Sequence, residues 1–246
     1  MLSIEVINVI LYNQMQVFKK GISVMKKMWK TALMKTIPVM TGYLVLGVGF
    51  GILSEKNGYG IIWALAMSLS IYAGSMQYVT ISLLTAGASL VTAAFTTLMV
   101  NARHLFYGIS MITPYKNAGK KKPYLIFALT DETYSLVCTG DFPKDTDPHT
   151  YCLCVSFLNH VYWVTGSVLG AWIGSAITFN TAGIDFAMTA LFVTVFVEQW
   201  LSTKNHIPAI TGVLASAICL MIFGSDNFLI PSMISISIIL SLGKKK

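Results

Sequence analysis

Long apolar runs, separated by short polar stretches, make up most of this chain. A helix needs roughly 17–25 mostly apolar residues to cross a bilayer, and several of these runs have that length. The pattern predicts an all-α integral membrane protein with about seven transmembrane helices (roughly six to eight). The candidate spans are Thr36–Ser54, Tyr59–Leu84, Ala88–Ile112, Tyr124–Thr139, Tyr151–Ile177, Phe186–Leu201, Ile207–Phe223 and Phe228–Leu242.

The composition supports a membrane protein, with 55% apolar residues, 11% charged residues and a mean hydropathy of +0.68. Little chain is left for a soluble domain. We expect a polytopic membrane domain over residues 31–246, preceded by a basic extension over residues 1–30. This extension lacks the pattern of a signal peptide because its lysines follow its apolar stretch, and Met25 or Met28 is an alternative start of translation.

The formal net charge is +7, and the lysines gather beside apolar runs without an accompanying basic-aromatic module. This arrangement is typical of topology signals and disfavours nucleic-acid binding. It predicts a cytoplasmic N-terminus and a cytoplasmic loop at Lys116–Lys122, and it places the acidic loop Asp141–His149 outside. The four cysteines lack the spacing of a metal site or a redox pair, so no metal or other cofactor is expected.

The second apolar run contains a polar break at Tyr72-Ala-Gly-Ser-Met-Gln77. An odd number of crossings must separate Lys56 from Lys116 if the lysine assignments hold, yet two apolar segments lie between them. A broken, re-entrant helix near Gly74 resolves the count, as in transporters with discontinuous helices. The N–H groups of a half-helix that starts there would bind an anion beside Ser75 and Gln77. A plain kink satisfied by neighbouring helices is the alternative.

Two short segments resemble each other. Ile37–Leu44 and Ile207–Leu214 share Ile, Pro, Thr, Gly and Leu at five of eight positions. In the re-entrant topology the two spans begin on opposite sides of the membrane. That is the arrangement of an inverted repeat, whose interface commonly binds the solute in transporters.

Glycines recur at every fourth residue in two spans. The first has Gly47 and Gly51, and the fifth has Gly166, Gly170 and Gly174. Glycines four apart share one helix face and let two helix backbones approach closely. They indicate either plain helix packing or a close approach beside a solute path.

Ionisable residues inside apolar runs usually mark an ion or solute path, because they are costly at bilayer depth. Three roles are open for Arg103, which follows Asn101. Its guanidinium would hold a substrate carboxylate, pair with Asp131 or Glu132, or snorkel to the cytoplasmic face. The candidate substrate-binding residues are Gly74, Ser75, Gln77, Asn101 and Arg103.

Proton coupling needs groups that change charge during transport. Asp131 and Glu132 are adjacent and point about 100° apart on a helix, so they cannot share one role. A desolvated carboxylate at this depth would take up a proton. The candidate proton carriers are Asp131, Glu132, His104 and His160.

The residues in this order resemble the AzlC family, the large subunit of branched-chain amino acid exporters. The resemblance covers about residues 33–242, and four motifs in register make it specific. The basic N-terminal extension departs from the family. The matching stretches are Ile37-Pro38 with Gly42, the Gly47–Gly51 run, Tyr72–Gln77, Asn101-Ala-Arg-His104, Thr130-Asp-Glu132, Asn159, Trp163, Gly166 and Gly170.

The resemblance implies a multi-pass permease of the plasma membrane that works with a small AzlD-type membrane subunit. It also implies export of branched-chain amino acids, with methionine as a further candidate, driven by the proton gradient. The chain has no nucleotide-binding loop, so an ion gradient is the simpler drive, and no enzymatic activity is expected. The alternatives are a membrane-embedded metal-dependent enzyme that uses His104 and His160, and a scaffold subunit without transport activity.

Overall fold

The computed structural model describes residues 4–144, 146–176 and 203–243, together with positions 186, 189, 190, 193, 196, 197, 200 and 201. The described residues contain helices and no strand. The helices are α1 (Ile4–Lys56), α2 (Ile61–Ser70), α3 (Gly74–Thr85), α4 (Leu90–Met111), the short 3-10 helix η1 (Gly119–Lys121), α5 (Lys122–Phe127), α6 (Asp131–Val137), α7 (Pro148–Ala176), α9 (Ile207–Asn227) and α10 (Leu229–Gly243).

Among the described residues, three helices are long and apolar enough to cross a membrane: Gln14–Lys56, Pro148–Ala176 and Ile207–Gly224. The count of seven therefore stays a prediction, and the predicted span 186–201 lies largely outside the described residues. The predicted single span Tyr124–Thr139 is wrong. It consists of two short helices, α5 and α6, because the chain leaves helical geometry at Thr130, which then caps α6.

The chain forms two compact units. The first contains residues 1–86 and 101–179, and the second contains residues 87–100 and 180–246. In the second unit, α9 packs against α10, and α9 bends at Gly224, whose φ of 73° suits glycine alone among common residues. The two similar segments of the sequence lie one in each unit, inside α1 and at the start of α9.

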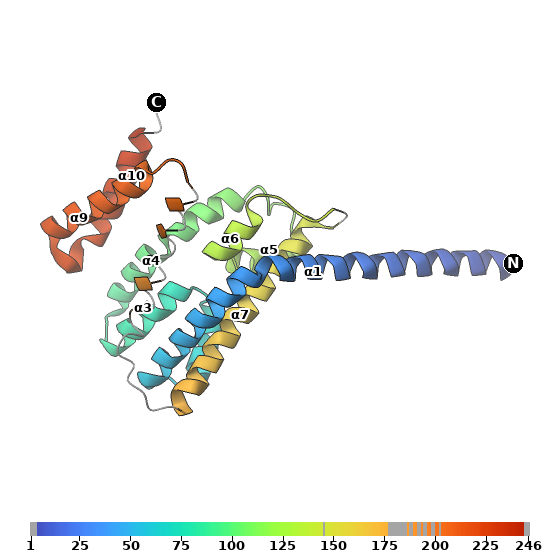
Figure 1. Cartoon of the computed structure of the whole chain (residues 1–246), viewed down its shortest axis with the longest axis horizontal. Helices are drawn as coiled ribbons and strands as arrows, with labels where there is room; N and C mark the ends of the chain where they lie inside the picture. Colours follow the sequence, from blue (N-terminus) through green and yellow to red (C-terminus); the bar gives the residue numbers. More distant parts are fainter. Residues whose placement is uncertain are drawn as a thin grey trace. The chain divides into compact units, whose positions relative to one another are not determined.

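Helices α1 and α7 form the centre of the first unit and lie side by side in Figure 1. They run in the same direction, since their contacting residue numbers rise together. Thr36 hydrogen-bonds Tyr162 at 3.1 Å, and further along both helices Gly47 faces Gly166. The close contact comes from the repeated glycines, which act here as helix-packing residues. Helix α1 continues without interruption through the predicted domain boundary at residues 30 and 31.

Helices α2 and α3 form a hairpin that we call hairpin 1 (residues 61–85). It starts beside the C-terminal end of α1, where the Ser54 hydroxyl donates to the Tyr59 carbonyl at 2.7 Å. It reaches the level of Tyr43, whose ring contacts Tyr72. Helix α3 then runs back toward the C-terminal end of α1. The evidence is the Tyr78 hydroxyl, which donates to the Leu46 carbonyl at 2.7 Å. The helix break predicted near Gly74 thus lies at the tip of this hairpin.

Helices α5 and α6 form hairpin 2 (residues 122–137), which starts at the other end of the α1–α7 pair. Its tip also reaches Tyr43, whose hydroxyl lies 2.7 Å from the Thr130 hydroxyl. The chain then returns toward Lys35 of α1, whose ammonium pairs with Asp141 at 3.0 Å. The base of hairpin 2 packs into the apolar core of the unit, which contains Met28, Ala32, Met111, Tyr115, Leu125, Val137, Tyr151 and Val155.

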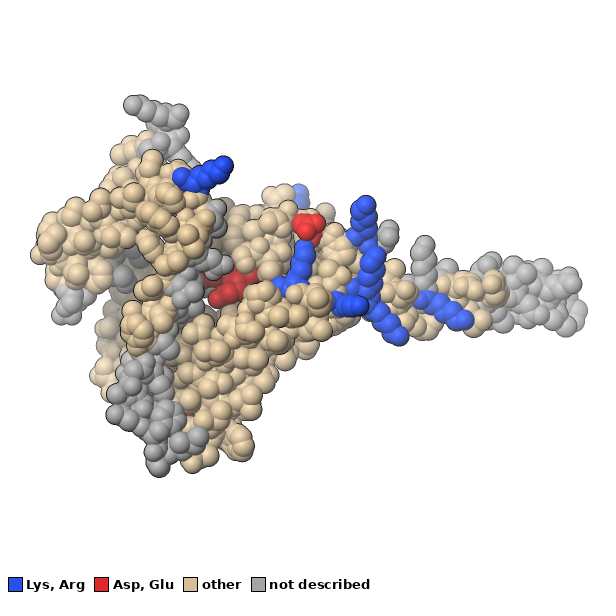
Figure 2. Space-filling view, viewed as in Figure 1, with Lys and Arg blue, Asp and Glu red and all other residues tan. Residues whose placement is uncertain are grey.

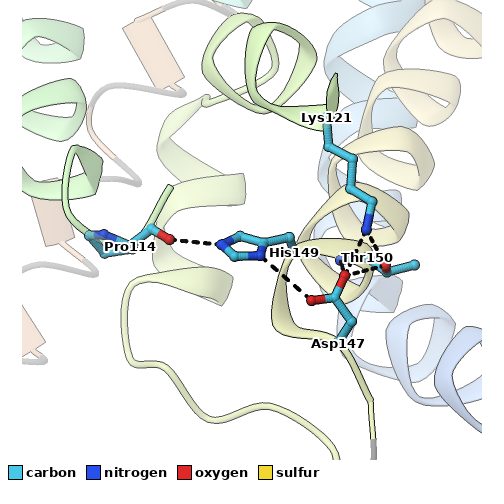
Figure 3. A network of polar contacts seen from close by, with 5 residues as sticks. All are labelled: Pro114, Lys121, Asp147, His149 and Thr150. Carbon is cyan, nitrogen blue, oxygen red and sulfur yellow. Dashed lines mark hydrogen bonds and ion pairs between the residues drawn. The ribbon is translucent and has the colours of Figure 1, made fainter. Parts of the chain in front are cut away.

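The loops at the base of hairpin 2 are joined by the polar network of Figure 3. Lys121 pairs with Asp147 at 2.6 Å, and the ring of His149 lies 3.0 Å from the Pro114 carbonyl. Lys121 and the hydrogen bonds from Thr150 hold the pKa of the Asp147 carboxyl well below its usual value. The network places the basic loop and the acidic loop on one side. The prediction that they lie on opposite sides of a membrane is therefore wrong, because hairpin 2 turns back instead of crossing.

Labelling of cysteines in sealed vesicles tests this arrangement. Cys138 is the exposed one of the four cysteines, so it is first replaced by serine. In this Cys138→Ser background, we expect Lys120→Cys and Asp141→Cys to react with a membrane-impermeant thiol reagent from the same side. Lys56→Cys is the matched control. It lies at the C-terminal end of α1, far along that helix from Lys35 and the two loops, and should react from the other side. Reaction of positions 120 and 141 from opposite sides would overturn the hairpin arrangement.

Positive side chains gather at one end of the first unit. In Figure 2 most of the blue side chains lie over the middle of α1 and the loops beside it. Lys35 and the lysines of η1 belong to this basic end. Such an asymmetry is the usual mark of the cytoplasmic face of a membrane protein.

Candidate functional site

The tips of the two hairpins meet beside Tyr43 of α1, and Arg103 of α4 joins them. One terminal nitrogen of its guanidinium lies 2.6 Å from the Asp131 carboxylate at the tip of hairpin 2. The other donates to the Ser75 hydroxyl at the tip of hairpin 1 at 2.8 Å. Of the three roles that the sequence left open for Arg103, the structure shows pairing with Asp131. It adds a bond to Ser75 that the sequence did not suggest.

The tip of hairpin 1 is strained. Tyr72 has a φ of 44°, in the left-handed region that a bulky side chain rarely adopts. Its ring is buried and lies against His160, with ring centres 4.2 Å apart and ring planes tilted by 30°. It also contacts Phe127 at the end of α5. Backbone strain of this kind costs of order 1–3 kcal/mol, clusters at functional sites and needs surrounding contacts to hold it. Here hairpin 2 and α7 supply them.

Gln77 holds hairpin 1 closed. Its side chain is fully buried, and its amide nitrogen donates to the Ser68 hydroxyl at 3.1 Å. Its amide oxygen accepts a hydrogen bond from the Trp163 indole at 2.8 Å. The ring of Trp163 also lies against Gly74, where an added Cβ would come within 3.0 Å of it. Gln77 and Gly74 therefore shape the tip through α7, and the amide of Gln77 already has two partners.

Glu132 faces α1, away from Arg103. The Tyr43 hydroxyl donates to its carboxylate at 2.6 Å and also lies next to Thr130. The adjacent residue Asp131 faces α4 instead. The two carboxylates thus take different partners, as their spacing predicted. Tyr43 is a site residue that the sequence did not single out, since a tyrosine inside an apolar span gives no local signal.

The two predicted histidines differ in their surroundings. Both ring nitrogens of His160 have partners, the Ser68 carbonyl at 3.1 Å and the Tyr124 hydroxyl at 3.0 Å. The carbonyl can only accept, so the nitrogen that faces it carries the proton. His160 therefore ties both hairpins to α7. His104 makes a long contact of 3.3 Å between its Nδ1 and the Asn101 carbonyl, and its ring lies edge-on to Tyr107 with ring centres 6.0 Å apart.

A cavity of about 470 Å³ lies beside the tip of hairpin 1, between α4 and α5. Its size falls within the roughly 300–1,000 Å³ of typical small-molecule sites. Most of its lining residues are apolar, among them Phe127, Leu129 and Met111. Asn101 and His104 are the predicted site residues that line it, and neither predicted carboxylate does.

Within the described residues, no three His, Cys, Asp or Glu side chains lie close enough to hold a metal ion. His104 and His160 are therefore not joined by a third ligand in this part of the chain. The alternative of a metal-dependent enzyme gains no support from the arrangement.

Comparison with known proteins gives the site its context. The family model described as "AzlC protein" matches residues 38–177, which include both hairpins, Arg103 and all of α7. The chain is 44% identical over 217 residues to the "Branched-chain amino acid transport protein AzlC" of Bacillus subtilis, covering 88% of this chain and 85% of that protein.

A protein of Helicobacter pylori named "Uncharacterized membrane protein" is 40% identical over 220 residues, covering 89% of this chain and 96% of that protein. The "Inner membrane protein YgaZ" of Escherichia coli is 29% identical over 167 residues, covering 65% of this chain and 68% of that protein. No solved structure matches. With a family model over more than half of its length and relatives this similar over most of it, the chain belongs to the AzlC family.

Proposed function

We propose that this chain is the large subunit of an exporter of branched-chain amino acids, and of methionine, in the plasma membrane. The observation that carries the proposal is Arg103, which joins the tips of two broken helices beside a cavity. Discontinuous helices whose ends meet at mid-depth are typical of transporter binding sites. The printed name of the Bacillus subtilis relative supplies the solute class.

The orientation that we propose puts the N-terminus and the basic end in the cytoplasm. The band of positive side chains at that end supports it. Hairpin 2 is then re-entrant from the cytoplasm and hairpin 1 from the outside. A solute bound where their tips meet would be reached from either side, depending on which hairpin moves.

In the proposed cycle the solute carboxylate binds beside Ser75 and Arg103, at the Gly74 break. It competes with Asp131 for the guanidinium, because both are carboxylates that suit the same donor pair. Asp131, once released from its ion pair, takes up a proton, which couples transport to the proton gradient. Glu132 is the second candidate carrier, whereas His104 and His160 have lesser roles. A small AzlD-type membrane subunit completes the transporter.

Counterflow of labelled leucine, isoleucine, valine and methionine in proteoliposomes tests the proposal. We expect saturable exchange with the small subunit present. In a separate measurement, net uptake and export in the same vesicles should fall when the pH gradient is collapsed. Labelled lysine and aspartate are the matched control solutes and should not exchange. A folded complex that exchanges none of the four amino acids would overturn the solute class. Net uptake and export that ignore the pH gradient would overturn proton coupling.

A further inference from the structure

The cavity beside hairpin 1 has a polar end and an apolar end. The face of α4 that lines it carries Asn101, His104, Leu105 and Gly108, which share one face because they are three or four residues apart. Asn101 lies close in sequence to Arg103 and hence to the hairpin tips. Gly108 lies two turns further along. The lining from α5 consists of Ile126 and Phe127 together with one charged residue, Lys122.

The polar end has an unused acceptor. The side-chain oxygen of Asn101 is buried and has no hydrogen-bond partner among the described residues. A buried acceptor without a donor is costly, and native proteins rarely keep one without a reason. An ammonium group supplies up to three donors and would satisfy this acceptor once the Asn101 side chain turns its oxygen toward the cavity that the residue lines.

The apolar end has unused space. A Cβ built on Gly108 meets no atom within 4 Å, so this glycine opens volume that a larger residue would fill. Side chains on a helix lean toward its N-terminus, so a leucine at position 108 would extend toward Leu105 and Asn101. The residue at position 108 thus controls how long an apolar group the cavity accepts.

We propose that this cavity binds the apolar side chain of the transported amino acid, with its ammonium on Asn101 and with Gly108 setting the permitted side-chain size. The inference rests on the proposed transport function and names the specificity residue of that site. It assigns Asn101 to the solute, whereas Arg103 and Asp131 join the hairpin tips in the state without solute.

A graded series at position 108 tests the inference. In counterflow, we expect Gly108→Val and Gly108→Leu to lower leucine and methionine exchange at least about tenfold more than alanine exchange, because a filled pocket rejects the larger solute. Gly42→Val is the matched control, since Gly42 also has open space around its Cβ position but lies on α1 away from the cavity. It should leave the order of preference unchanged.

The outcome separates the two proposals. Absence of exchange by the unmodified protein counts against the transport function itself. Exchange by the unmodified protein, with equal losses for all solutes in the position 108 series, overturns the pocket alone.

A second measurement does not need a transport-competent variant. In a Cys138→Ser background, alkylation of Gly108→Cys should slow at least about threefold with saturating leucine and remain unchanged with aspartate. Slowing by the small subunit or by lipid, without an effect of leucine, would identify another occupant and overturn the inference.

Discussion

Replacing Gly51 by alanine should abolish the folded protein. A Cβ there would collide with the Ser167 carbonyl and the Ala171 backbone of α7, and backbone atoms cannot move aside as a side chain can. Overpacking usually costs about 1–3 kcal/mol, and a clash with backbone exceeds that range. We expect Gly51→Ala, and likewise Gly170→Ala, to lose the monodisperse peak in size-exclusion chromatography and the cooperative thermal transition in detergent.

A series along α1 provides the controls. At Gly47 a Cβ would lie 3.0 Å from Gly166, so Gly47→Ala should cost about 1 kcal/mol and lower the transition temperature without abolishing folding. At Gly42 nothing lies within 4 Å, so Gly42→Ala should leave stability unchanged or slightly raised, since alanine favours helix. Equal effects at the three positions would show that the α1–α7 contact is looser than described.

Removing Arg103 should lower exchange about 100-fold and destabilise the first unit. Asp131 is then left half-buried without its cation. Loss of one partner costs about 3–5 kcal/mol in a fully buried pair, and we expect less in this partly exposed one. Arg103→Lys should be intermediate, because a single ammonium cannot reproduce the fork that reaches both Asp131 and Ser75. Thermal transitions and leucine counterflow, measured on the same preparations, provide both readouts.

Two controls separate stability from transport. Lys121 pairs with Asp147 at the same 2.6 Å but on the loops, so Lys121→Met should cost at most about 1 kcal/mol and leave exchange intact. The double variant Arg103→Met with Asp131→Leu should regain stability, since apolar residues can replace an ion pair, yet stay inactive. Recovery of exchange in the double variant would show that these charges serve packing alone.

Two helix breaks, one near Gly74 and one before Asp131, illustrate how much could be predicted from the sequence. The break near Gly74 was predictable because glycine, serine and glutamine interrupt an apolar run. The break before Asp131 was missed because Ala128 and Leu129 are apolar and read as continuing helix. Thr130 followed by two acidic residues is the signal that could have revealed it, since that pattern is typical of a helix N-terminus.

The site was predictable as a set of residue types but not as a set of contacts. Asn101, Arg103 and Asp131 were identifiable because polar groups are costly in an apolar run. The choice of Asp131 as the partner of Arg103 depends on how α4 faces hairpin 2, which no local pattern specifies. Tyr43 escaped notice for the same reason, because its hydroxyl becomes important only when Glu132 is placed beside it.

The glycine contacts between α1 and α7 also restrict the mechanics of any working cycle. Two helices whose backbones touch cannot slide past each other without each glycine meeting a larger neighbour. The α1–α7 pair should therefore move as one rigid body. Each hairpin contacts this pair near its tip, through Tyr43 and through Trp163, and His160 of α7 bonds to both hairpins. Breaking the Arg103 bridge would therefore free the hairpin tips from α4 while both hairpins stay attached to the α1–α7 pair.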